Sequence, residues 1–232
     1  MVGGSGGIGA AAASALAEAG YDILLVARDG RRLREAADRI PRARTVVADA
    51  ATEEAMSDAL GRLDRIGVLV HAAGARVGKV VAQQPAELLD TLYRSHLRSA
   101  FVSVRAALAR MVDGGRIVLV SSVAAHRPVP GLAGYCAMKA GLGMFAESLR
   151  YELGGRVGVS VVVPAQVDTA MLAKRWRCIQ PGDVADAVVW LAGLDPALHV
   201  DEFELRATLS GPFAPPLSGP PDAPLGVVAV PR

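Results

Sequence analysis

Tyr135 and Lys139 stand four positions apart, a spacing that places two side chains on one face of a helix. An ammonium group beside a phenol favours the phenolate, so we expect Lys139 to lower the pKa of Tyr135 from its usual value of about 10. The pair Ser121-Ser122 lies upstream, directly after the apolar run Ile117–Val120. Together these residues indicate proton-transfer chemistry, whereas a Tyr and a Lys alone at this spacing are typical of a solvated helix face.

A glycine-rich run at residues 3–9 opens an Ala-rich stretch of helical composition. Backbone N–H groups in such a loop can approach a pyrophosphate closely, and the N-terminus of the following helix adds a favourable dipole. Two spacings fit the run, G-x-G-x-x-G from Gly4 and G-x-x-x-G-x-G from Gly3. In a chain with 25 glycines, either spacing alone also fits a flexible N-terminal stretch.

The elements that must position these residues alternate along the chain. Continuous apolar runs, typical of buried parallel strands, are Ile23–Ala27, Thr45–Ala48, Val68–Ala72, Ile117–Val120 and Val159–Val163. Segments with helical periodicity are Ala10–Ala19, Arg32–Arg39, Glu53–Leu63, Ala86–Met111, Tyr135–Leu153 and Val184–Leu194, the last capped by Asp183. A last strand is expected at Phe203–Ala207. This alternation predicts an α/β fold, a doubly wound parallel sheet of the Rossmann type.

The chain of 232 residues is suited to one such domain, which we place at residues 1–208. Residues 209–232 hold seven of the 14 prolines and show no helical period, so they are expected to form a Pro-rich tail.

The start of the chain departs from a doubly wound fold, in which a strand delivers the chain into the glycine loop. Only Met1 and Val2 precede Gly3, whereas a strand usually has about five or six residues. The first, central strand is thus apparently truncated. Either the start has been assigned too far downstream, which we expect, or the chain lacks that strand.

Composition disfavours several classes of protein. A hydrophobic content of 52% and a formal net charge of +2 are typical of a globular chain. Aromatic residues make up 4%, and the arginines are scattered, so we expect no nucleic-acid partner. Cys136 and Cys178 are too few for a disulfide framework or a zinc site, and no metal site is predicted. Without an apolar run of about 18 residues or a signal sequence, we expect a cytoplasmic protein with no membrane partner.

From Val2 to about Thr208, the chain resembles the short-chain dehydrogenase/reductase family. The matching stretches are the loop glycines Gly3, Gly7 and Gly9, Asp49-Ala50 after a strand, His71-Ala72-Ala73-Gly74 where the family usually has Asn-Asn-Ala-Gly, the set Ser122, Tyr135 and Lys139, and Pro164-Ala165-Gln166-Val167-Asp168-Thr169. These motifs are highly specific for the family and almost silent about the substrate.

The resemblance implies hydride transfer between a nicotinamide and a small or mid-sized carbonyl or alcohol. Tyr135 would be the general acid/base, Ser122 would hold the substrate oxygen, and Lys139 would bind the nicotinamide ribose. The implied cofactor-binding residues are Gly3, Ser5, Gly7, Ile8, Gly9, Arg28, Asp49, Ala50, Ala73, Gly74, Tyr135, Lys139, Val167 and Thr169. The long helices resemble those that pair between subunits in this family, so a homodimer or homotetramer is expected.

Three positions depart from the family pattern. His96 stands where the family usually has a catalytic Asn, which holds a water in a proton relay to the Lys. A histidine can also hydrogen-bond, so His96 is either a catalytic or a structural residue. Ala165 replaces the usual Gly and Val2 the usual Thr, and neither change removes a reacting group.

The end of the second strand bears on the choice of cofactor. An NAD site needs a carboxylate there for the ribose 2′-hydroxyl, and by register with the family this position is Ala27. Arg28 follows and could pair with a 2′-phosphate. We therefore expect NADP, with NAD as the alternative if Asp29 supplies the carboxylate.

Two other classes of function compete with an enzyme. A non-catalytic family member that binds a nucleotide or a partner is motivated by His96 and the short first strand. The set of Ser122, Tyr135 and Lys139 argues against it, because a binding module does not need those residues. An RNA-binding or membrane-surface protein ranks last, because the arginines are interspersed with carboxylates.

Overall fold

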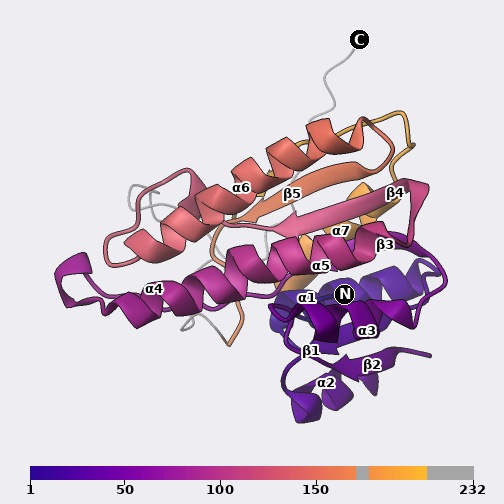
Figure 1. Ribbon diagram of the computed structural model, residues 1–232, viewed down its shortest axis with the longest axis horizontal. Helices are drawn as coiled ribbons and strands as arrows, with labels where there is room; N and C mark the ends of the chain where they lie inside the picture. The colour runs from indigo at the N-terminus through magenta and orange to yellow at the C-terminus, as the bar shows by residue number, and fades with distance from the viewer. Residues whose placement is uncertain (171–177, 208–232) are drawn as a thin grey trace, which may run out of the picture.

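A parallel sheet runs through the middle of the protein (Figure 1). The computed structural model describes residues 1–170 and 178–207. The strands are β1 (Leu24–Ala27), β2 (Arg44–Val47), β3 (Ile66–His71), β4 (Met111–Val120), β5 (Gly158–Pro164) and β6 (Glu202–Leu205). β1 pairs with β2, and the others pair in the order β3-β4-β5-β6, always in parallel. Val2 bridges Val26 of β1 and His71 of β3, so the two ladders meet at the N-terminus. The doubly wound, Rossmann-type sheet is confirmed.

The central position of this sheet is held by Met1 and Val2. Val2 N–H donates to Val70 O, and Val2 O accepts from Ala72 N–H, both at 2.9 Å. On the other side, Val26 N–H donates to Met1 O at 2.9 Å. Two residues therefore take the place of a strand at the C-terminal end of β1 and β3, which is the end where doubly wound folds bind ligands.

The Met1 ammonium group is buried beside a cavity at the other end of these strands. Its nitrogen donates to Leu24 O at 2.8 Å, and burial lowers its pKa to about 5. The cavity has a volume of about 290 Å³, and its apolar lining residues include Met1, Leu16, Ile23, Leu63, Ile66 and Val70. The sheet is thus incompletely filled between the first residues of β1 and β3.

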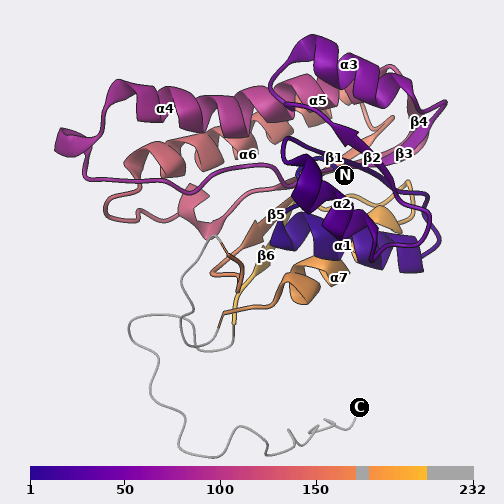
Figure 2. The same ribbon diagram turned by 90° about the horizontal axis from the view of Figure 1, so that it is seen from below.

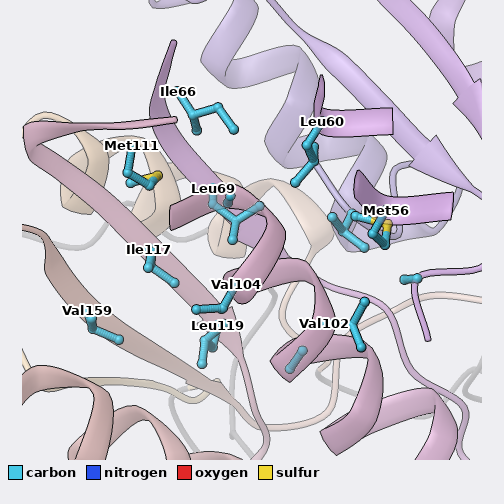
Figure 3. Close-up of a cluster of buried hydrophobic side chains, with 14 of the residues drawn as sticks. Met56, Leu60, Ile66, Leu69, Val102, Val104, Met111, Ile117, Leu119 and Val159 are labelled. Atoms are coloured by element: carbon cyan, nitrogen blue, oxygen red, sulfur yellow. The ribbon is translucent and has the colours of Figure 1, made fainter. Parts of the chain in front are cut away.

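Helices cover both faces of the sheet, as Figure 2 shows. α1 (Gly7–Glu18), α2 (Gly30–Ala37) and α7 (Pro181–Ala192) pack on one face, and their buried residues share one apolar core with the sheet. α3 (Glu53–Gly61), α5 (Ser99–Leu108) and α6 (Ala133–Leu153) contribute to a second core on the other face. In that core Met56 and Leu60 lie near Leu69 and Val102 (Figure 3). The Val, Ile and Leu runs form strands because both of their faces are buried.

The segment Ala86–Met111, predicted as one helix, is divided in the structure. α4 (Ala86–Tyr93) leads into a π-helical turn, η2 (Arg94–Arg98), which passes into α5. α5 ends at Leu108, and Met111 begins β4 by pairing with Ile66. The prediction of an uninterrupted helix was wrong because helical spacing does not reveal a π-turn, a feature frequent at functional sites.

Capping at α7 also differs from expectation. The helix begins at Pro181 with Gln180 as its N-cap, and Asp183 occupies the third position. The Asp183 carboxylate accepts from Gln180 N–H at 2.6 Å, which completes a capping box. Short 3₁₀ turns, η1 (Val81–Gln83) and η3 (Val123–Ala125), complete the elements of the described residues.

Three further features were considered in the sequence: a Pro-rich tail, a membrane span and a metal site. The predicted tail, residues 209–232, lies outside the described residues. Within residues 1–170 and 178–207, no helix has the length and apolar character needed to span a membrane. No cluster of three or more His, Cys, Asp or Glu side chains suited to a metal ion occurs in those same ranges.

Candidate active site

Ser122, Tyr135 and Lys139 come together at the C-terminal end of β4. Ser122 follows the strand and caps η3, its Oγ accepting from Ala124 N–H at 3.2 Å. Tyr135 and Lys139 lie one turn apart near the start of α6 and are both buried. The Tyr135 and Ser122 side chains share a hydrogen bond. The structure therefore brings the three predicted catalytic side chains to one place.

Lys139 is held by the backbone of the strand that carries Ser122. Its Nζ donates to Val120 O at 2.8 Å, and Ser121 Oγ donates to Lys139 O at 3.2 Å. Burial lowers the pKa of Lys139 to about 8. Near neutral pH the side chain is therefore still mostly an ammonium, but one whose proton is more easily lost than that of an exposed lysine.

Tyr135 does not have the lowered pKa that the sequence predicts. Burial raises the pKa of Tyr135 above its usual value, and the hydrogen bond with Ser122 and the positive charge of Arg76 oppose this only in part. Lys139 Nζ lies 5.8 Å from the centre of the Tyr135 ring and donates to a backbone carbonyl. Desolvation of the phenol thus outweighs the expected effect of the ammonium, and Tyr135 is protonated at neutral pH.

His96 lies beside Tyr135, where η2 faces the site. The two rings meet edge to face, with centroids 5.4 Å apart. His96 Nε2 lies 2.7 Å from Ala75 O and 3.3 Å from Ala75 N, so the backbone of Ala75 engages this ring nitrogen in either tautomer. Burial and the charge of Lys139 lower the pKa of His96 to about 3, so the ring is neutral. Its Nδ1 has no hydrogen-bond partner among the described residues.

His71 is the second buried histidine near this site and was singled out only as part of a motif. Its Nε2 lies 3.0 Å from Ser99 Oγ in α5. Burial first, and the charge of Lys139 second, lower its pKa to about 3. A neutral, fully buried ring joining β3 to α5 indicates a structural residue.

The glycine loop is packed so closely that side chains would disrupt it. Gly3 has a φ of +83°, and a Cβ there would lie 2.6 Å from Ala73 N. A Cβ on Gly9 would collide with Gly3 O, and one on Gly74 with the His96 ring. Helix α1 begins at Gly7, so the N–H groups of its first turn have no partners within the helix. This bare backbone cradle fits the pyrophosphate of a dinucleotide.

The segment after β5 closes on the same loop. A Cβ on Gly7 would lie 2.9 Å from Thr169 Cγ2, so Thr169 is next to the glycine loop. Val167 is buried and bridges Ile179, which anchors this segment just before α7. The structure thus brings the predicted residues Val167 and Thr169 to the sheet end that also holds Ser122 and Tyr135.

Arg28 and Asp29 have different surroundings at the end of β1. Asp29 is the N-cap of α2, and its Oδ1 accepts from Arg31 N–H at 3.1 Å and Arg32 N–H at 3.0 Å. One oxygen of its carboxylate therefore caps the helix. Arg28 is exposed, and its charge reaches Asp49 at the end of β2.

Sequence reasoning missed two residues near the site. Arg76 lies close enough to lower the pKa of Tyr135, and Arg94 forms an ion pair with Asp49 at 2.8 Å. Neither belongs to a motif, and Arg94 contacts a residue 45 positions earlier in the chain. The only signal in the sequence was the proximity of Arg94 to His96.

Comparisons with known proteins agree with this geometry. The family model described as short chain dehydrogenase matches residues 1–179. A 3-oxoacyl-[acyl-carrier-protein] reductase of Rickettsia felis is 29% identical over 210 residues, covering 83% of this chain and 87% of that protein. A cyclic-di-GMP-binding biofilm dispersal mediator protein of Escherichia coli is 30% identical over 213 residues, covering 83% and 88%.

Solved structures show the same fold. A short chain dehydrogenase from Burkholderia cenocepacia, solved in complex with NADP, has a TM-score of 0.80 and 26% identity, covering 88% of this chain and 94% of that one. The family match spans most of the chain and includes the glycine loop and the Ser122, Tyr135 and Lys139 set. The chain is therefore an oxidoreductase that belongs to the short-chain dehydrogenase/reductase family.

Proposed function

We propose that this protein is an NADP-dependent oxidoreductase that interconverts a small or mid-sized carbonyl compound and its alcohol, with Tyr135 as the general acid/base. The observation that carries the proposal is the meeting of Ser122, Tyr135 and Lys139 beside the glycine loop. Three different elements supply these groups and the loop, so their convergence is a property of the fold.

The proposed reaction assigns one task to each side chain. A bound NADPH would supply the hydride to the carbonyl carbon. Ser122 Oγ holds the carbonyl oxygen, and the Tyr135 hydroxyl donates its proton to that oxygen as negative charge develops there. The products are the alcohol and NADP⁺, and Tyr135 recovers a proton from solvent through neighbouring groups.

Lys139 and the residues around it support that proton transfer. An ammonium has three N–H donors, and Val120 O accepts one of them. The others are suited to a ribose hydroxyl and to a water. The neutral His96 ring has an Nδ1 with no hydrogen-bond partner among the described residues, so we assign it a hydrogen bond with such a water in place of the usual Asn.

Arg28 supports NADP rather than NAD. Ala27 offers no carboxylate to the ribose 2′-hydroxyl, and the Asp29 carboxylate caps α2. The Burkholderia cenocepacia relative was solved with NADP, which agrees with this preference. We assign Asp49-Ala50, in the loop after β2, to the contact with adenine.

The role of Arg28 in the preference for NADP over NAD can be measured with the variant Arg28→Ala. We expect it to weaken NADPH binding by about 1.5–3 kcal/mol, the contribution of a hydrogen bond to a charged group, while NADH binding changes little. Titration of cofactor fluorescence gives both affinities, and Arg31→Ala is a control because Arg31 pairs with Glu35 on α2. Equal losses for both cofactors would remove Arg28 as the determinant.

Exposed apolar side chains on α5 and α6 support a homodimer or homotetramer. Phe101 is 51% exposed, Met144 67% and Tyr151 81%. Exposed side chains of this size on neighbouring helices are typical of an interface. We propose that copies of this chain pair there in the cytoplasm, and light scattering that gives a monomer at all concentrations would contradict this.

The function itself is tested by turnover. Purified protein should oxidise NADPH when supplied with members of a panel of aldehydes and ketones, measured by the loss of absorbance of NADPH. The alternative, a non-catalytic nucleotide-binding protein, predicts NADPH binding without oxidation by any carbonyl compound. That outcome would reject the proposed activity and keep only the binding site.

A further inference from the structure

Two arginines of the π-turn η2 hold the loop that follows β2. Arg94 Nη2 donates to Asp49 Oδ2 at 2.8 Å and lies 3.4 Å from Thr52 Oγ1. Arg98 Nε donates to Ala51 O at 2.9 Å. The same turn directs His96 toward Tyr135. One short segment therefore contacts both the loop after β2 and the reacting end of the site.

Both carboxylate oxygens of Asp49 accept hydrogen bonds, one from the loop and one from η2. Oδ1 accepts from Ala51 N–H at 3.0 Å, and Oδ2 accepts from Arg94. Partial burial raises the pKa of Asp49, but the Ala51 hydrogen bond, the Arg94 guanidinium and the charge of Arg28 together lower it below its usual value. Asp49 is therefore a carboxylate at neutral pH, with two guanidinium groups near it.

Without the Arg94 ion pair, the negative charge of Asp49 would weaken the binding of a 2′-phosphate. A carboxylate near Arg28 competes with the phosphate for that guanidinium, and it also repels the phosphate directly. Arg94 is half exposed and approaches Asp49 from η2, whereas Arg28 follows β1. An arginine that pairs with the carboxylate leaves Arg28 available for an anion, and it makes the local sum of charges positive.

We propose that Arg94 is a specificity-determining residue that favours NADP over NAD, because it neutralises Asp49 and leaves Arg28 free for the 2′-phosphate. Arg94 is a positioning residue in this account, since it acts through Asp49 and touches neither the phosphate nor the reacting atoms. The inference rests on the proposed cofactor, and its test is chosen so that the two can fail separately.

The test measures binding of adenosine 2′,5′-bisphosphate and of 5′-AMP, which carry no nicotinamide and cannot be turned over. In Arg94→Ala we expect the first to bind about five-fold more weakly at low salt, the size of effect that an exposed ion pair supplies. Binding of 5′-AMP should change by less than about two-fold on the same scale. Arg94→Lys should recover most of the loss, because it restores the charge.

Two comparisons separate this role from a structural one. Arg105→Ala removes an arginine of α5 that pairs with Glu53 at 3.0 Å, and it should leave both affinities unchanged. In an Asp49→Asn background, Arg94→Ala should have no selective effect, because no carboxylate remains to be neutralised. A melting temperature for each variant identifies any that fails to fold, and Arg94→Gln then replaces Arg94→Ala.

Each outcome decides the proposal. Equal weakening of both nucleotides, or a selective loss that persists in the Asp49→Asn background, would overturn it, as would no loss at all. If the unmodified protein does not prefer the bisphosphate, the proposed cofactor and this inference both fail. If it does prefer the bisphosphate but oxidises no NADPH with any carbonyl compound, the proposed activity fails and the role of Arg94 stands.

Discussion

Tyr135→Phe is expected to lower kcat for carbonyl reduction by about 10²–10⁴-fold, the contribution typical of a general acid. The phenol is buried, and its raised pKa keeps it protonated at neutral pH, so it can donate to the carbonyl oxygen. Phenylalanine preserves the ring that meets His96 edge to face and removes only the hydroxyl. Binding of NADPH should therefore change little. The loss of NADPH absorbance gives kcat, and quenching of fluorescence gives the affinity.

Tyr151→Phe is the matched control for this variant. Tyr151 lies on the same helix α6, but it is 81% exposed and near the far end. The same chemical change there should leave kcat and NADPH affinity unaltered. If Tyr135→Phe turned over a carbonyl compound as fast as the unmodified protein, Tyr135 would not be the acid.

An extension of four Val or Ile residues before Met1 is expected to stabilise the protein by about 2 kcal/mol or more at pH 7. Such a segment would enter the 290 Å³ cavity between β1 and β3, whose walls combine apolar side chains such as Leu16 with charged ones such as Asp22 and Arg62. Its backbone can continue the hydrogen bonding that Met1 and Val2 begin with Val26 and Val70. It also replaces the buried ammonium by an amide. For a domain of this size each kcal/mol raises Tm by about 2–4 °C, which a thermal melt resolves.

The stabilisation that the extension provides should increase as the pH falls. The pKa of the Met1 ammonium is about 5 in the folded protein, against 8.0 for the ordinary group. Between these values the unfolded chain binds the proton and the folded chain does not. The contribution of this one group to stability therefore falls by up to about 1.4 kcal/mol for each pH unit between pH 8 and pH 5. The buried His71 and His96 add their own losses below about pH 6.5, equally with and without the extension. The advantage of the extension should grow over the same range.

Two controls separate the effect of removing the buried ammonium from the effect of filling the cavity. An N-acetylated Met1 removes the titration of the ammonium and leaves most of the cavity, so it should abolish the part of the pH dependence that Met1 causes, with a smaller gain in stability. A Gly-Ser extension of equal length supplies backbone but no apolar side chains. If the Gly-Ser and Val-Ile extensions gave equal melting temperatures, filling of the cavity would not be a source of stability.

Much of the fold could be predicted from sequence because the strands are buried on both faces. Runs such as Val159–Val163 are continuous and β-branched, and the structure places them inside β5 with only small changes of boundary. The turn between Arg94 and Arg98 could not be predicted, because its residues fit an ordinary helix and only the surrounding contacts select a π-turn. The capping role of Asp29 was not predicted, because it depends on where α2 begins.

The site was predictable where chemistry depends on spacing and unpredictable where it depends on burial. The positions of Tyr135 and Lys139 follow from helical geometry, and the structure brings them together with Ser122. The direction of the Tyr135 pKa shift was wrong, because desolvation depends on every neighbour in space. The pairing of Arg94 with Asp49 joins distant segments, which no local pattern reveals.

Transfer of deuterium from NADPH labelled at nicotinamide C4 tests the proposed activity most directly. The protein is incubated with a carbonyl compound that it turns over and with each of the two C4-deuterated forms of NADPH. The product alcohol is then examined by mass spectrometry and NMR. We predict that one of the two forms places deuterium on the carbinol carbon and that the other does not. An alcohol that carries no deuterium with either form, or no alcohol product at all, would contradict hydride transfer at this site.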